Sequence, residues 1–326
     1  MGSEGNGLVP DQIVERIRCP SCGERMTEDG GTGGVRCLAG HGFSGDEGYL
    51  DFSSEIEFGG TTARTLGTFG YEWNSFDEVR EEDEGFAEIY FRDLDLGTLA
   101  GKIGLDAGCG KGRFTQFLAP HLSAVVALDG SSAVEAAACN LSKYPNAVVV
   151  KSDLRDAPFA PESFDFISSL GVLHHLDDPR EGFMRLLTYL APRGRILLYL
   201  YSRPSTLCAR RVALTMANAL RKVTVRLPHR AVKAISRPIA ACLYFGIVLP
   251  ARWGEQKGVG ALARLPMDTY RDKPFRSLVL DTFDRLSAPV EHRYVWGELE
   301  SWFTTAGIRI DAAREETGWF VLAHKP

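Results

Sequence analysis

Short apolar runs separated by polar turns dominate the middle and the end of the chain. Seven of these runs read as β-strands: Ile103–Leu105, Ala124–Asp129, Ala147–Lys151, Phe164–Ser169, Arg195–Tyr201, Ile308–Ala312 and Trp319–Ala323. Helical spacing of apolar residues follows in Phe114–His121 and again in Val295–Thr305, which has Gly307 past its end. This alternation predicts an α/β fold with a doubly wound, mostly parallel, seven-stranded Rossmann-like sheet.

The pattern changes along the chain and divides it into predicted parts. Residues 1–16 read as a flexible tail, 17–53 as a small zinc-ribbon-like module, and 54–96 as an acidic helical connector or lid. Residues 97–201 form the predicted cofactor-binding core. A basic helical insertion at 202–290, broken by several prolines, follows the fifth strand, and residues 291–326 return to close the core.

A glycine-rich turn, Asp106-Ala-Gly-Cys-Gly-Lys-Gly112, stands between the first predicted strand and its helix. Glycines let backbone N–H groups approach a ligand closely, and the helix that follows favours an anionic group. Arg113 occupies the last glycine position of a dinucleotide fingerprint, so that fingerprint is not matched. The turn predicts a small charged cofactor of another kind.

Further acids end the following strands. Asp129 lies 23 residues after Asp106, about the distance that places a carboxylate on ribose hydroxyls in a doubly wound fold. Asp153 and Leu154 follow the third strand, and the fourth strand leads from Phe164 into a segment with Leu170, two histidines and Pro179.

These motifs, in this order, resemble the class I S-adenosylmethionine-dependent methyltransferases over residues 97–201. The resemblance implies that Gly108 and Gly110 pass close to the methionine part of the cofactor, that Asp129 holds both ribose hydroxyls, and that Asp153 and Leu154 bracket the adenine. It also implies an antiparallel last strand. We add Asp106, Leu170 and Tyr71 to the predicted cofactor site. Tyr71 and Trp73 could cover the sulfonium by cation–π attraction or could be ordinary core aromatics.

Four metal-ligand residues near the N-terminus have the spacing C-x2-C-x14-C-x3-H: Cys19, Cys22, Cys37 and His41. Two thiolates on a C-P-x-C-G knuckle and a second pair from a facing hairpin suit tetrahedral Zn²⁺, and four protein ligands make the zinc structural rather than catalytic. The segment resembles the zinc module of bacterial ribosomal RNA guanine-N1 methyltransferases, in which the module helps to recognise RNA. The R-T-x-x-x-F-G-Y-x-W run at 64–73 instead resembles methyltransferases of bacterial small-molecule and polysaccharide pathways.

Charge is distributed unevenly. Residues 44–96 hold fifteen acids and three bases, and this acidic balance disfavours nucleic acid as a partner. Between Glu181 and Glu255 there are thirteen bases and no acid. The basic insertion has three readings: a helical lid with solvated or paired bases, a pocket for a carboxylate or phosphate compound, or a surface that touches an anionic membrane or nucleic acid. The apolar run Ile239–Leu249 is short for a membrane span, so none is expected.

Methyl transfer from a sulfonium needs alignment and exclusion of water, and a base only if the acceptor must lose a proton. The candidate bases are His174, Tyr201 and His292, each with a packing or hydrogen-bonding role as the alternative.

We therefore predict a cytoplasmic S-adenosylmethionine-dependent methyltransferase with structural zinc, acting on a small-molecule or lipid- or sugar-linked metabolite. The seven cysteines, an odd number without secretory context, favour a reducing compartment. The alternatives are an RNA methyltransferase with a zinc RNA-reading module, transfer or cyclisation of the cofactor's aminocarboxypropyl group, and a non-catalytic zinc scaffold.

Overall fold

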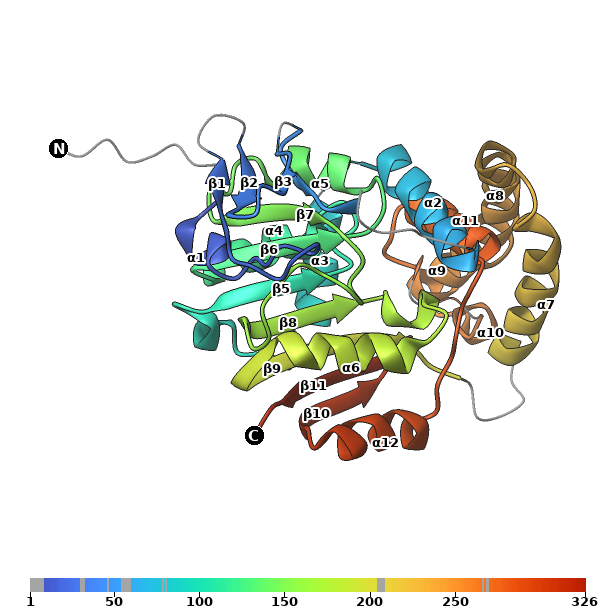
Figure 1. Cartoon of the computed structure of the whole chain (residues 1–326). Coiled ribbons are helices and arrows are strands. Elements are labelled where there is room, and N and C mark those ends of the chain that lie inside the picture. The colour runs from blue at the N-terminus through green and yellow to red at the C-terminus, as the bar shows by residue number, and fades with distance from the viewer. Residues whose placement is uncertain are drawn as a thin grey trace. The chain divides into compact units, whose positions relative to one another are not determined.

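A computed structural model describes residues 9–29, 33–45, 47–53, 60–77, 79, 81–203, 209–265, 267 and 270–326. An eight-stranded sheet has the order β10-β11-β9-β8-β5-β6-β7-β4 (Figure 1). Neighbouring strands are parallel from β4 through to β9, and β11 is antiparallel to both β9 and β10. The strands are β4 (Leu50–Asp51), β5 (Ile103–Ala107), β6 (Ala124–Asp129), β7 (Ala147–Lys151), β8 (Phe164–Leu170), β9 (Leu190–Tyr201), β10 (Arg309–Glu315) and β11 (Gly318–His324).

The central strands are apolar without interruption because helices cover both faces of the sheet. Every residue of β5 is buried, as are the first five of β6. Apolar side chains of α6 and α12 pack in one layer, and those of α3, α4 and α5 pack in the other. These helices are α3 (Glu81–Tyr90), α4 (Arg113–Leu118), α5 (Val134–Leu141), α6 (Pro179–Tyr189) and α12 (Trp296–Ala306). The predicted fold class is confirmed, including the antiparallel last strand.

The N-terminal segment is ordered earlier than predicted. Residues 9–16 were expected in a flexible tail, but α1 (Asp11–Val14) forms there, and Ile13 and Ile17 are fully buried against the sheet. Arg18 N donates to Pro158 O at 2.8 Å. Apolar side chains therefore hold this part of the chain to the core.

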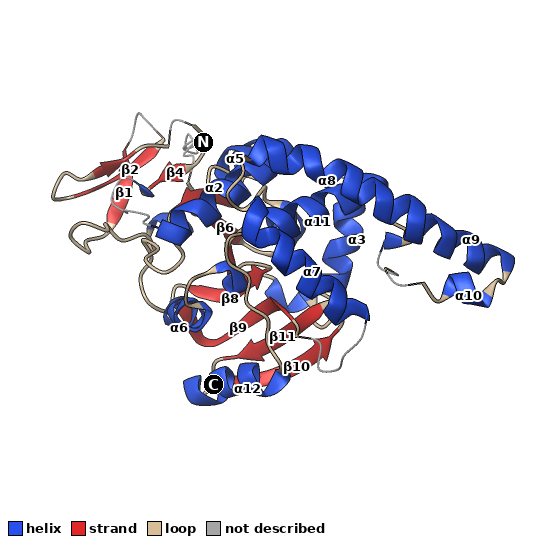
Figure 2. Ribbon diagram, turned by 90° about the vertical axis from the view of Figure 1, so that its right-hand side faces the viewer, coloured by secondary structure: helices blue, strands red, loops and turns tan. Residues whose placement is uncertain are grey.

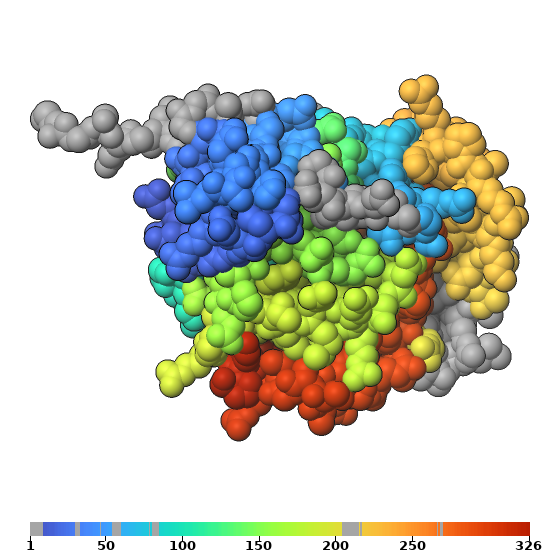
Figure 3. Space-filling view, viewed as in Figure 1, coloured from blue at the N-terminus to red at the C-terminus, as the bar shows by residue number. Residues whose placement is uncertain are grey.

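The Cys/His segment forms a small antiparallel sheet of β1 (Met26–Asp29), β2 (Gly34–Cys37) and β3 (Gly42–Phe43). The chain then enters the main sheet as β4, the eighth strand, which the sequence pattern did not predict. Asp51 of β4 accepts from Lys151 of β7 at 3.0 Å. In the space-filling view the residues of this segment lie directly against the core (Figure 3).

The connector contains α2 (Gly60–Ser75), α3 and the short helix η2 (Leu96–Leu99). Asn74 of α2 donates to Ser132 O at 3.1 Å, which ties the end of α2 to the turn before α5. Residues 54–59, 78 and 80 of the predicted connector lie outside the described residues.

Residues 204–289 form a second compact unit. Its helices are α7 (Ala209–Thr224), α8 (His229–Leu243), η5 (Tyr244–Val248), α9 (Leu249–Lys257), α10 (Gly260–Ala263) and α11 (Phe275–Ser287) (Figure 2). Within the core, the points where this unit departs and returns are adjacent, because Ser202 pairs with Tyr294 and Arg203 N donates to Tyr294 O at 2.9 Å.

One continuous helix runs from His229 to Lys257 through α8, η5 and α9. By length and composition this helix could cross a membrane, and it is the single such helix found in the described residues. The helix is longer than the apolar run Ile239–Leu249 indicated, because Pro238 does not end α8 and η5 continues it as a π-helical turn.

Candidate active site

The turn after β5 can be built only with glycine. Gly108, Gly110 and Gly112 have φ of 84°, 53° and 82°, in the left-handed region. A Cβ on Gly108 would lie 2.3 Å from a methyl carbon of Val172. The N–H groups of Gly108 and Cys109 both donate to Leu128 O, at 2.7 and 2.9 Å. These bonds fix the turn beside the end of β6.

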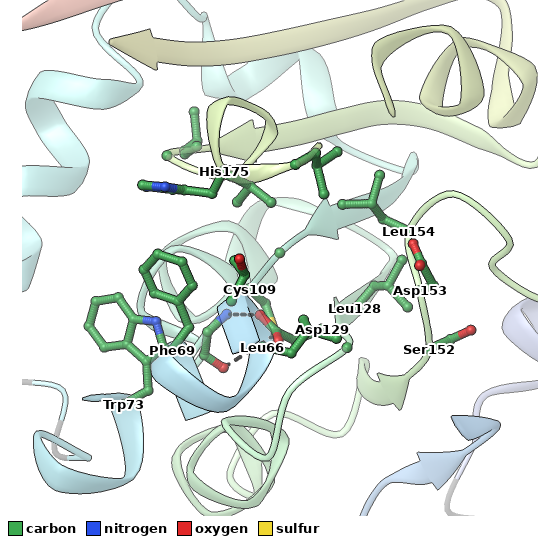
Figure 4. Close-up of a pocket in the computed structure, with 18 of the residues that line it drawn as sticks. Leu66, Phe69, Trp73, Cys109, Leu128, Asp129, Ser152, Asp153, Leu154 and His175 are labelled. Carbon is green, nitrogen blue, oxygen red and sulfur yellow. Dashed lines mark hydrogen bonds between the residues drawn. The ribbon is translucent and has the colours of Figure 1, made fainter. Parts of the chain in front are cut away.

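Asp129 ends β6 and anchors the turn. One carboxylate oxygen accepts from Gly110 N at 2.9 Å, and the other accepts from Ser131 N and Ser131 Oγ at 2.8 and 2.6 Å (Figure 4). Burial raises the pKa of Asp129, although the hydrogen bonds from Ser131 and Gly110 favour the carboxylate. The structure therefore positions this carboxylate through backbone amides.

A cavity lies at the carboxyl ends of these strands, where a doubly wound sheet binds its ligands (Figure 4). Six of the predicted cofactor residues line it: Gly108, Gly110, Asp129, Asp153, Leu154 and Leu170. Asp153 forms an ion pair with Arg155, with 2.5 Å between Oδ2 and the guanidinium.

Helix α2 forms one wall of the cavity. Its lining residues fall at i, i+3, i+4, i+7 and i+11, on one side of the helix: Thr62, Thr65, Leu66, Phe69 and Trp73. Tyr71 is two residues from Phe69 and is not among the residues that line the cavity, so the cavity does not support its prediction as a cofactor residue. Trp73 does line the cavity, where the guanidinium carbon of Arg113 lies 5.3 Å from its ring centroid.

Asp106 does not line the cavity either, and this prediction is also corrected. Its carboxylate accepts from Thr115 Oγ1 at 2.6 Å and from Ser168 Oγ at 2.9 Å, which joins β5 to α4 and β8. Burial raises its pKa to about 6. Asp106 therefore links the strand before the turn to α4 and β8 and does not line the cavity.

The three candidate bases lie together beyond the end of β9. The rings of His174 and Tyr201 are 3.9 Å apart between centroids, and His292 N donates to His174 O at 2.8 Å. None of the three is among the residues that line the cavity. The guanidinium of Arg293 lies 4.8 Å from the centroid of the Tyr201 ring and pairs with buried Glu291 at 2.7 Å.

His174 is fully buried, and no described residue forms a hydrogen bond with either of its ring nitrogens. The same holds for His292 Nε2. Burial, followed by the nearby His175, Arg293 and His292, lowers the pKa of His174 well below its usual value, so the ring is neutral. Burial of an imidazole without hydrogen bonds to described residues costs free energy of folding.

His175 was not predicted, yet it is the histidine that lines the cavity. Its Nδ1 lies 2.7 Å from Val290 O. Because a carbonyl oxygen can only accept, Nδ1 carries a proton, and Nε2 is the nitrogen left for a ligand. Its ring packs on Phe69, with centroids 4.8 Å apart. The sequence contained the adjacent histidines, but which of the two faces the cavity depends on the turn η4 (Leu173–His175).

The four predicted metal ligands converge. Their ligand atoms all lie within 4.8 Å of one another. The sulfurs of Cys22 and Cys37 are 3.7 Å apart, and His41 Nδ1 lies 3.4 Å from the sulfurs of both Cys19 and Cys37. Tetrahedral zinc with Zn–S bonds of about 2.3 Å would place two sulfurs about 3.8 Å apart. The group therefore has the dimensions of a tetrahedral metal site.

Residues 105–198 match a protein family described as "Methyltransferase domain". Ubiquinone biosynthesis O-methyltransferase of Schizosaccharomyces pombe is 31% identical over 38% of this chain and 46% of its own length. Demethylmenaquinone methyltransferase of Clavibacter sepedonicus is 33% identical over 35% of this chain and 46% of its own length. A SAM-dependent methyltransferase from Aquifex aeolicus has a solved structure that covers 79% of this chain and 98% of its own, with 16% identity and a TM-score of 0.46.

The similarity to these curated relatives covers 30–38% of this chain. The chain spans between a quarter and about half of the length of the curated relatives that it matches.

Proposed function

We propose that the chain is a class I S-adenosylmethionine-dependent methyltransferase acting on a small, lipid-soluble acceptor, and the match of residues 105–198 to a methyltransferase domain supports this. The observation that carries the proposal is the cavity at the carboxyl edge of the sheet, where a glycine turn and two strand-end carboxylates meet.

The residues present fit the cofactor. At Gly108 a side chain would collide with Val172, so the turn keeps its backbone bare beside the cavity. Asp129 would accept from the ribose hydroxyls, and Asp153 and Leu154 would flank the adenine. When bound, S-adenosylmethionine supplies an electrophilic methyl group on a sulfonium. The chain itself supplies alignment, and the apolar side chains of α2 exclude water.

The acceptor side is aromatic and basic. Phe69 and Trp73 give the cavity an apolar wall, and His175, held through Nδ1, is the histidine in its lining. A phenol or similar acidic hydroxyl would lose its proton to His175 Nε2 as it is methylated. Two relatives are named for ubiquinone biosynthesis and as a demethylmenaquinone methyltransferase, which favours an aromatic acceptor. His174 would act by positioning His175, because it does not reach the cavity.

Calorimetry with S-adenosylmethionine and with S-adenosylhomocysteine tests the cofactor assignment. We expect binding of both. Transfer of a labelled methyl group to a panel of lipid-soluble phenols and quinols then tests the acceptor class. If neither S-adenosylmethionine nor S-adenosylhomocysteine gives heat, the proposal that the chain is an enzyme of this kind is refuted. If the cofactor binds but no phenol or quinol becomes labelled, only the proposed acceptor class is refuted.

We further propose that Cys19, Cys22, Cys37 and His41 hold structural Zn²⁺. Two of the ligands are buried, and the sulfur spacing suits a tetrahedral ion. The small sheet of β1, β2 and β3 has few buried apolar residues of its own, so a metal would contribute much of its folding free energy. All four positions would be filled by protein, which leaves no place for a catalytic water.

Metal analysis of the purified chain should give one zinc per molecule. Cys22→Ser should lose the metal. Its melting temperature should fall, because bound metal stabilises the folded segment, and this segment continues directly into β4 of the main sheet. Cys139→Ser removes an exposed thiol outside the group and serves as the control. Equal zinc content in the two variants would contradict the site.

A further inference from the structure

Large exposed apolar side chains are concentrated in the insertion. Among the described residues, eight large hydrophobic side chains are exposed, and six of them belong to residues 204–289: Leu220, Val223, Leu227, Phe245, Trp253 and Val259. Phe245 is 65% exposed and Trp253 is 52% exposed. A soluble unit seldom exposes so much apolar surface without a partner for it.

The long helix of the insertion has two different sides. One side is buried against α11, where Ala240 and Val248 pack with Leu278 and Val279. The exposed Phe245 and Trp253 lie on the other side, and only 22% of the most apolar stretch of this helix is buried. The unpartnered side is therefore apolar and aromatic.

Cations accompany these side chains on both helices. Arg230 and Arg237 are exposed on α8, as are Lys222 and Arg226 near the end of α7. Leu220, Val223 and Leu227 recur there at i, i+3 and i+7. None of these four cations has an ion pair with a described residue, and residues 204–254 contain no acid. These four positive charges are therefore available to a negatively charged partner.

We propose that the insertion docks on an anionic lipid bilayer, with Phe245 and Trp253 entering the headgroup region and Arg230 and Arg237 holding lipid phosphates. Tryptophan and phenylalanine beside exposed Arg and Lys are typical of interfacial helices. The helix lies on the surface instead of crossing it. The uncharged stretch between Arg237 and Arg252 is 14 residues long, about 21 Å of helix against a hydrocarbon core of about 30 Å. Docking is independent of the proposed methyl transfer.

Sedimentation with vesicles tests the proposal. The full chain should bind vesicles of phosphatidylcholine with phosphatidylglycerol, bind pure phosphatidylcholine far less, and lose binding as salt rises. The double variant R230Q/R237Q should bind the anionic vesicles about 30-fold more weakly at low salt, from about 1 kcal/mol for each cation. R309Q, which removes an exposed cation from β10, is the matched control.

The apolar part is tested with F245S/W253S, which should lower binding to both kinds of vesicle by more than about tenfold. L38S removes a 93% exposed leucine from the N-terminal segment and should have no effect. Circular dichroism shows whether each variant is folded. Tryptophan fluorescence gives a second measurement: lipid should shift the emission of the full chain to the blue, and W253F should abolish this shift while the other four tryptophans remain.

Three results would overturn the proposal. Binding that survives both double variants would place the lipid contact elsewhere. Resistance to extraction by alkaline carbonate would show a spanning helix. A wild-type dimer that F245S/W253S dissociates, in a chain that ignores vesicles, would assign this surface to a second copy of the chain.

Discussion

The two sides of the cavity are built by different means. On the side expected to bind the cofactor, the polar atoms are already joined to one another: Asp129 accepts three hydrogen bonds from the turn and from Ser131. On the acceptor side, His175 lines the cavity and its Nδ1 is bound to Val290 O. Next to it, outside the cavity lining, the ring nitrogens of His174 have no hydrogen-bond partner among the described residues. Hydrogen bonds to the backbone therefore fix the first side, whereas packed aromatic and imidazole rings form the second.

This difference indicates which part of the protein is general and which is specific. Backbone amides and glycine positions recognise the constant part of a cofactor and leave little freedom for change. Histidine and tyrosine side chains can be replaced without altering the sheet. We therefore expect specificity for the acceptor to depend on His175, which lines the cavity, and on His174, whose ring packs against it.

The largest expected effect is on the acceptor side. Asn in place of His175 keeps an N–H donor for Val290 O but removes the basic Nε2. Methyl transfer to the acceptor found in the panel should fall by about 10²- to 10⁴-fold in kcat, with binding of S-adenosylhomocysteine unchanged. His121→Asn, on the short helix after α4, is the control. If H175N keeps full kcat, the acceptor needs no base from this side.

An intermediate effect is expected on the cofactor side. Asp129→Ala removes the acceptor of three hydrogen bonds and any contact with the ribose. The affinity for S-adenosylhomocysteine should fall by about 100-fold, measured by calorimetry, because hydrogen bonds to a charged group contribute about 1.5–3 kcal/mol each. Asp311→Ala, which removes a partly exposed acid from β10, should bind normally. Equal affinities in the two variants would mean that the glycine turn keeps its conformation without the Asp129 carboxylate.

The smallest effect is on stability. His174→Phe keeps an aromatic ring against Tyr201 and removes two unpaired nitrogens, so it should stabilise the fold by about 1–2 kcal/mol in urea unfolding. The wild-type pKa of His174 is lowered in the folded chain, whereas the unfolded chain binds a proton below about pH 6.5. Stability should therefore fall as pH decreases below 6.5, by up to about 1.4 kcal/mol per pH unit from this residue.

Asp106 acts in the opposite direction, because its raised pKa of about 6 makes the folded chain bind the proton more tightly than the unfolded chain. Its contribution to stability is lost as pH rises through 6. The test is therefore the difference between wild type and H174F across pH 5 to 8, where Asp106 contributes equally to both. A constant difference would show that His174 does not titrate as inferred.

The sequence predicted the strands, the glycine turn and the meeting of the four Cys and His ligands, since these follow from local pattern and spacing. The sequence did not predict correctly which residues line the cavity, because this depends on the direction in which each side chain points. Tyr71 and Trp73 are two residues apart on α2, and only Trp73 lies on the side that lines the cavity. Asp106 was assigned to the cofactor by its place in a motif, whereas its bonds to Thr115 and Ser168 depend on β8 and α4 packing around it.

The adjacency of Ser202 and Tyr294 has a consequence for how such an enzyme could change over time. A stretch of chain that leaves and rejoins a scaffold at neighbouring positions can be lengthened, shortened or exchanged by a single recombination without disturbing the strands on either side. Homologues that share the cofactor-binding core could thus carry unrelated insertions at this point. Transferring an insertion from one core to another could then change where in the cell the enzyme is located.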